Sequence, residues 1–193
     1  MRKTAEKKIA EFIQLLFIYF ILSLAIGAVK VYYVTGILNP EIIETAKVSG
    51  YVSLIVSSIV SMIVLLLITG ICYFVIQVFD LKISTPVLLE GIKTSVIVFM
   101  IAELVKFSFV FIFLRQEIQT FTASVDIMPE LKLTRWYFYD STVKYAMLLI
   151  GTFAFGFKTY EITQGRYFFH ILVLSMVLLA GFYVSTIDLF GVF

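Results

Sequence analysis

Five long apolar runs with few charged side chains limit the fold of this chain more than any other feature. The runs are Phe12–Val29, Tyr51–Phe79, Thr94–Leu114, Val143–Phe157 and Tyr167–Leu189. About 20 apolar residues in a helix cross the roughly 30 Å hydrocarbon core of a bilayer. Of the 193 residues, 61% are hydrophobic and 15% are charged, and a soluble domain could not bury so much apolar surface. We therefore predict an all-α, polytopic integral membrane protein with five transmembrane helices in a single domain, residues 1–193.

The ends of these runs carry local signals of their own. The second run is longer than one crossing needs, which predicts a tilted or projecting helix. Thr85 precedes Pro86, so we predict Thr85 as the N-cap of the third helix, with proline at its first position. The fourth run is short unless Trp136–Tyr139 begins the same helix.

Basic residues favour one orientation in the membrane. Five spans place the two termini on opposite sides. Eight Lys and Arg residues lie on the side of the N-terminus and six on the other side, and Arg2, Lys3, Lys7 and Lys8 form the densest group. Cytoplasmic loops are richer in Lys and Arg, so we predict a cytoplasmic (inner) membrane protein with a cytoplasmic N-terminus.

Glu103 and Lys106 are two charged residues inside the third run. An ionised side chain at the centre of a bilayer costs about 2.5–3.5 kcal/mol even on insertion scales, so each needs compensation. Their i, i+3 spacing places them on one helix face, where they can pair. One interpretation is a self-neutralising pair that faces protein; the other is a proton or ion relay. A relay needs further ionisable groups, and only His170 and Asp188, near the two ends of the last run, stand out.

Small residues mark helix faces that could pack closely. Ser53, Ser57 and Ser61 repeat every four residues on the second run, and Gly181 and Ser185 do so on the last. Such spacing lets a second backbone approach. The contact could lie within the bundle or with another subunit.

Catalytic and ligand-binding signatures are absent from the sequence. There is no Gly-rich phosphate loop, nucleophile elbow or HExxH motif, and one histidine and one cysteine do not build a metal site. The net charge of +2 and the lack of a basic cluster argue against nucleic acid. We predict no enzymatic activity, no cofactor and no metal. The long polar segment Arg115–Asp140 is interpreted as a surface-lying amphipathic segment or a solvated linker.

The second half of the chain resembles the Yip-domain family of small membrane proteins. The likeness rests on Ile83-Ser84-Thr85 before the third run and on the connection Phe157–Arg166 between the last two, within residues 50–190. The resemblance implies five spans, no enzymatic activity and an accessory role beside transport machinery.

Together these features predict a non-catalytic subunit or assembly factor of a larger membrane protein complex. Its partners would be the lipid bilayer and other membrane protein subunits. The alternative is a small transporter or channel component in which Glu103 titrates beside Lys106. If the two charges are partners, removal of Glu103 alone should destabilise the protein more than removal of both.

Overall fold

A computed structural model describes residues 2–36, 40–117 and 131–186. Within these ranges the chain is all-helical, without strands. The elements are α1 (Arg2–Thr35), α2 (Pro40–Val78), α3 (Thr85–Phe109), the π-helix η1 (Val110–Leu114), α4 (Arg115–Glu117), α6 (Arg135–Thr163) and α7 (Phe168–Thr186). The prediction of an all-α fold is confirmed for this part of the chain.

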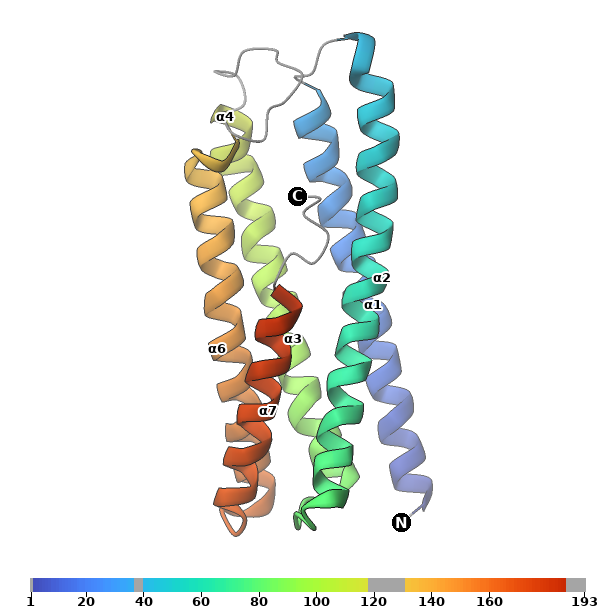
Figure 1. Ribbon diagram of the computed structural model, residues 1–193, viewed down its shortest axis with the longest axis vertical. Coiled ribbons are helices and arrows are strands. Elements are labelled where there is room, and N and C mark those ends of the chain that lie inside the picture. The colour runs from blue at the N-terminus through green and yellow to red at the C-terminus, as the bar shows by residue number, and fades with distance from the viewer. Residues whose placement is uncertain (1, 37–39, 118–130, 187–193) are drawn as a thin grey trace.

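The five long helices run side by side along one axis (Figure 1). The start of α1, the α2–α3 turn and the α6–α7 turn lie at one end of the bundle, drawn at the bottom of Figure 1. We call this the α1-start end, and the opposite one, where α6 begins, the α6-start end. The described part of α7 ends at Thr186, partway along α2. Buried side chains of α1, α2, α3, α6 and α7 form the main core.

Three of the helices are long and apolar enough to cross a membrane. The candidate spans are Glu6–Thr35, Ile43–Val78 and Thr85–Glu117. The described apolar part of α7, Phe168–Val184, is shorter. α6 meets no such criterion and carries Asp140, Lys144 and Lys158 along its length. The membrane-spanning character of the chain therefore rests on three helices, and the count of five spans stays a prediction.

Two predicted helix boundaries need correction. The N-cap of α3 is Ser84 rather than Thr85, because Thr85 already has helical geometry and the Ser84 carbonyl accepts from the N–H groups of Val87 and Leu88. The segment predicted as one polar stretch, Arg115–Asp140, contains α4 and the first turns of α6. Thr134 caps α6 by accepting the Tyr137 N–H at 3.1 Å, so Asp140 is a helical residue. Residues 118–130 lie outside the described part of the chain.

Small residues allow α3 and α6 to pack at close range. Ser95 is fully buried and donates to the Gly151 carbonyl at 2.7 Å. A Cβ on Gly151 would lie 2.5 Å from the Phe99 ring, and one on Gly91 would lie 2.5 Å from Thr159 Oγ1. Gly91 and Ser95 thus form a small-xxx-small face that the sequence interpretation missed, because it placed the start of the third span at Thr94.

Candidate functional site

The charged pair in α3 exists and is buried. Lys106 Nζ donates to Glu103 Oε1 at 2.6 Å, and the exposed fractions of the two side chains are 11% and 12%. Glu103 lies two residues beyond the middle of the candidate span Thr85–Glu117. The pair therefore has the geometry that its i, i+3 spacing predicts.

The sequence pointed only to His170 and Asp188 as further ionisable groups, and it missed one that acts on Lys106. Asp140 of α6 lies close enough for its negative charge to act on Lys106. Asp140 in turn accepts a hydrogen bond from Lys30 of α1 at 3.0 Å. We call these four residues, in the order Lys30, Asp140, Lys106 and Glu103, the charge ladder. Their signs alternate and they connect three helices.

An aromatic side chain lies near each end of the charge ladder. The ammonium of Lys30 lies 5.5 Å from the centre of the Trp136 ring, a cation–π distance. Tyr19 of α1 is buried within electrostatic range of Glu103. Trp136 Nε1 is buried without a hydrogen-bond partner in the part of the chain that the structure describes. The other buried groups without a partner are the hydroxyls of Ser58 and Thr159. A helical serine or threonine can donate to a carbonyl of its own helix, whereas an indole cannot, so the Trp136 N–H is the hardest of the three to satisfy.

A π-helical turn follows the ladder on α3. The Val110 N–H is shared among the carbonyls of Lys106, Phe107 and Ser108, and η1 continues to Leu114. Short π-segments of this kind occur often at functional sites. Nothing in the run of valine, phenylalanine, isoleucine and leucine that forms η1 predicts it.

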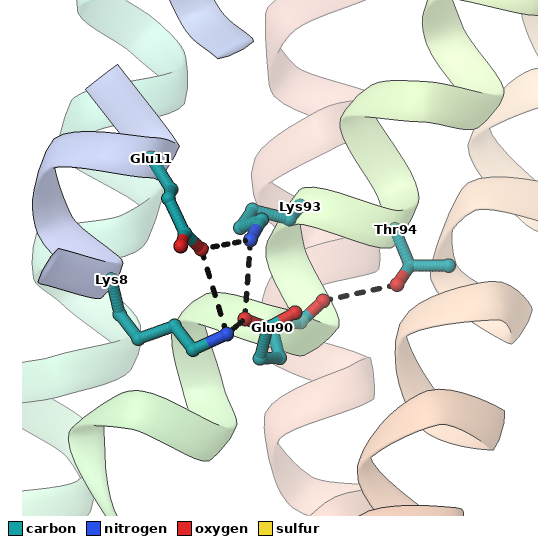
Figure 2. Close-up of polar contacts among 5 residues, drawn as sticks. All are labelled: Lys8, Glu11, Glu90, Lys93 and Thr94. Atoms are coloured by element: carbon teal, nitrogen blue, oxygen red, sulfur yellow. Dashed lines mark hydrogen bonds and ion pairs between the residues drawn. The ribbon is translucent and has the colours of Figure 1, made fainter. Parts of the chain in front are cut away.

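A second charge cluster joins α1 to α3 at the α1-start end of the bundle (Figure 2). Glu90 bonds to Lys8 and, at 3.1 Å, to Lys93; Lys93 also donates to Glu11 at 2.9 Å. We call Lys8, Glu11, Glu90 and Lys93 the end cluster. Glu11 and Lys30 stand nineteen residues apart on α1, about 29 Å along the helix axis. This separation is close to the roughly 30 Å thickness of a hydrocarbon core.

We expect the substitution Glu90→Gln to lower the free energy of unfolding by up to about 1 kcal/mol, because the end cluster is only partly buried. This loss of stability should be smaller at high salt, because screening then weakens the same ion pairs in the wild-type protein. Unfolding in mixed detergent micelles at low and high salt would measure it. A salt-independent loss would show that packing, rather than charge, is responsible.

The other predicted site residues are spread over the bundle. On α2, Ser53 is half-buried, and Ser57 and Ser61 are exposed and donate to their own backbone. Gly181 packs against Ile68 of α2, where an added Cβ would lie 2.8 Å from Ile68 Cγ1. Asp188 and the side chain of Ser185 lie outside what the structure describes.

His170 lies at the α1-start end, away from the charge ladder. Its Nδ1 accepts the Lys82 N–H of the α2–α3 turn at 3.4 Å, and its ring stacks on Tyr167. Among the described residues, no group of three or more His, Cys, Asp or Glu side chains is placed to hold a metal ion.

No protein-family model, curated protein or solved structure matches this chain. The resemblance to the Yip-domain family therefore stays a prediction. The class of protein that the fold itself defines is a helical bundle with three helices capable of spanning a membrane.

Proposed function

We propose that this protein is a non-catalytic subunit or assembly factor of a larger membrane protein complex. The observation that carries the proposal is a helix-packing face on α2 that continues beyond the level of Thr186, where the described part of α7 ends. Ser57, Ser61 and Ile68 lie on one side of α2, at i, i+4 and i+11. Ile68 packs against Gly181, whereas Ser57 and Ser61 are exposed.

Exposed serines on this face favour a contact between subunits over a contact within the bundle. Small side chains let the backbones of two helices approach each other closely. A lipid chain has no helix backbone, so small residues give no such advantage where a helix faces lipid. A transmembrane helix of a partner would therefore pack along α2 in line with α7. Large apolar side chains nearby, such as Ile55 and Ile59, are exposed and would add contact area.

The arrangement of the bundle supports the remaining features of this proposal. We propose five spans in a cytoplasmic membrane, with α6 and α7 crossing beside the three longer helices. Lys82 and Arg166 belong to the two turns at the end where α1 begins, and Lys158 lies in the last turns of α6 at the same end. This clustering of basic residues at one end supports a cytoplasmic N-terminus.

The test is co-purification from native membranes after extraction in a mild detergent. We expect Ser57→Leu and Ser61→Leu together to abolish the co-purification of partner chains while leaving the free energy of unfolding within about 0.5 kcal/mol of wild type. Ser108→Leu is the matched control, because Ser108 is an exposed serine on α3 that bonds its own backbone in the same way. A clean 22 kDa monomer from the wild type would contradict the proposal.

A second candidate function is a small transporter or channel component. The charge ladder favours it, because ionisable residues inside a membrane often mark ion or proton pathways. Glu103→Gln should then abolish flux in proteoliposomes without changing the helical content. Absence of flux in the wild type would rule this candidate out.

A further inference from the structure

Most of the exposed tyrosines lie at two levels of the bundle. Towards the α6-start end they include Tyr32 of α1, Tyr51 of α2 and Tyr139 of α6. Towards the α1-start end they are Tyr73 and Tyr160, in the last turns of α2 and α6. We call the first group the upper belt and the second the lower belt, because the α6-start end is drawn at the top of Figure 1.

Two contacts between helices place the upper belt at one level. A Cβ on Gly50 of α2 would lie 2.9 Å from Val31 of α1. Lys30 of α1 donates to Asp140 of α6 at 3.0 Å. Gly50, Val31 and Asp140 each directly adjoin a tyrosine of the upper belt in the chain. The three tyrosines therefore surround the bundle at the same height.

The distance between the belts matches a bilayer on two helices. Tyr51 and Tyr73 stand twenty-two residues apart on α2, about 33 Å along the helix axis. Tyr139 and Tyr160 stand twenty-one residues apart on α6, about 32 Å along its axis. A hydrocarbon core is roughly 30 Å thick, and tyrosine is enriched at its two interfaces with water. Both helices thus carry tyrosine at the spacing of two headgroup layers.

The middle turns of α6 present apolar side chains to the outside. Residues 145–157 carry no charge, and Leu149, Ile150, Phe153 and Phe157 are exposed. Exposed groups of this kind suit the hydrocarbon chains of lipid and would be unfavourable in water. The centre of α6 therefore has the surface of a transmembrane helix.

The charges that lower the hydropathy of α6 lie close to the belts. Asp140 adjoins the upper belt and is paired, and Lys158 binds Glu161 at 2.8 Å beside the lower belt. Lys144 and Tyr145 lie within about 9 Å of the upper belt along the helix axis. Helical side chains lean towards the N-terminus of their helix, so the polar ends of these two reach towards the upper belt. No charge of α6 has to remain unpaired at the centre of a bilayer.

We propose that phospholipid headgroups of the two leaflets contact the two belts, so that α6 crosses the bilayer between Tyr139 and Tyr160. The charge ladder then begins in one headgroup layer and ends near the midplane. This inference deepens the proposal of five spans by naming the lipid contacts and their levels. It does not depend on a partner subunit.

Contacts of α3 give the depth of the ladder. A Cβ on Gly91 would touch Thr159, the chain neighbour of Tyr160, so Gly91 lies at the lower belt. Glu103 stands twelve residues further along α3, about 18 Å from that belt. Lys30, at the other end of the ladder, lies at the upper belt. The ladder therefore connects one headgroup layer with the midplane and covers about half of the hydrocarbon core.

The test measures the depth of single tryptophans in phosphatidylcholine vesicles that contain lipids brominated either near the headgroup or near the chain ends. Trp136, the only tryptophan of the chain, is first replaced by phenylalanine. On this background, Tyr139→Trp and Tyr160→Trp report from the belts, and Leu149→Trp reports from halfway between them. Ile63→Trp is the matched control, because Ile63 is exposed halfway between the belts on α2, a candidate span by hydropathy.

We expect the deep bromines to quench Leu149→Trp and Ile63→Trp more strongly than the shallow bromines do. The order should be reversed for Tyr139→Trp and Tyr160→Trp. The ratio of deep to shallow quenching would thus be above one at the middle of both helices and below one in the belts. Circular dichroism checks that each variant keeps its helical content. If Trp136→Phe does not fold, the four positions are measured in the chain that keeps Trp136, by difference from its own quenching.

Shallow quenching of Leu149→Trp beside deep quenching of Ile63→Trp would overturn the proposal, because α6 would then lie outside the hydrocarbon core. The proposed subunit contact along α2 would survive that result, since co-purification tests it separately. Deep quenching of Tyr139→Trp or Tyr160→Trp would also overturn the proposal, because the headgroups would then lie elsewhere. Shallow quenching of Ile63→Trp as well would contradict the membrane-spanning class of protein itself.

Discussion

Replacement of Lys106 by methionine is expected to lower the free energy of unfolding by about 3–5 kcal/mol, the usual cost of removing one member of a buried ion pair. The ammonium of Lys106 donates a hydrogen bond to Glu103 and lies within electrostatic range of Asp140. Its loss leaves a buried carboxylate near the middle of the candidate span Thr85–Glu117 without its cation. Unfolding in mixed detergent micelles, followed by circular dichroism, would measure the loss.

Neutralising Glu103 as well should restore most of this stability. The double variant Glu103→Gln with Lys106→Met contains no unpaired charge at this position. Glu103→Gln alone should cost less than Lys106→Met, because Asp140 remains to compensate Lys106. This refines the expectation from sequence, in which a lone Lys106 had no other partner. Lys158→Met, which breaks an exposed pair of the same spacing, should be nearly neutral.

Equal stability of Lys106→Met and the double variant would contradict this prediction. It would mean that the two charges do not depend on each other. A double-mutant cycle gives the coupling energy directly, because the two residues are in contact.

The substitution Gly91→Ala is expected to destabilise the protein by about 1–3 kcal/mol, the range for overpacking a closely packed interior. The added Cβ would lie 2.5 Å from Thr159 Oγ1 and 2.7 Å from the ring of Phe155. Both neighbours are fully buried on α6 and cannot swing into open space. The helices would have to separate, which weakens the contact through Ser95 as well.

Gly70→Ala is the matched control for this prediction. A Cβ on Gly70 of α2 meets nothing within 4 Å, and alanine is the better helix former by up to about 1 kcal/mol. Gly70→Ala should therefore be neutral or stabilising in the same unfolding assay. A neutral Gly91→Ala would show that α3 and α6 do not pack as closely as the structure places them.

Much of the fold follows from the pattern of the sequence. Within the described residues, nearly all of each apolar run is helical, because a chain in lipid must satisfy its backbone hydrogen bonds internally. The ends of the helices were predicted less well. α2 begins at Pro40, ahead of the predicted Tyr51, because polar residues continue a helix beyond the membrane where hydropathy gives no signal.

The sequence also identified the centre of the candidate site but not its extent. The pairing of Glu103 with Lys106 depends only on local helix geometry, which spacing fixes. Asp140 is 34 residues from Lys106 in the chain and was assigned to a loop. Its place within electrostatic range of Lys106 depends on the register between α3 and α6, to which the Ser95–Gly151 contact contributes and which no single-sequence pattern encodes.

The sequence by itself determined that this chain is helical, that it has the apolar runs of a membrane protein, and that two opposite charges share one face of α3. These follow from hydropathy, helix periodicity and residue spacing, all of which are local. The tertiary structure decided which side chains from distant helices meet that pair. It also decided that Ser57 and Ser61 are exposed while Gly91 and Ser95 are buried, since burial depends on which neighbouring helix reaches each face and where it stops.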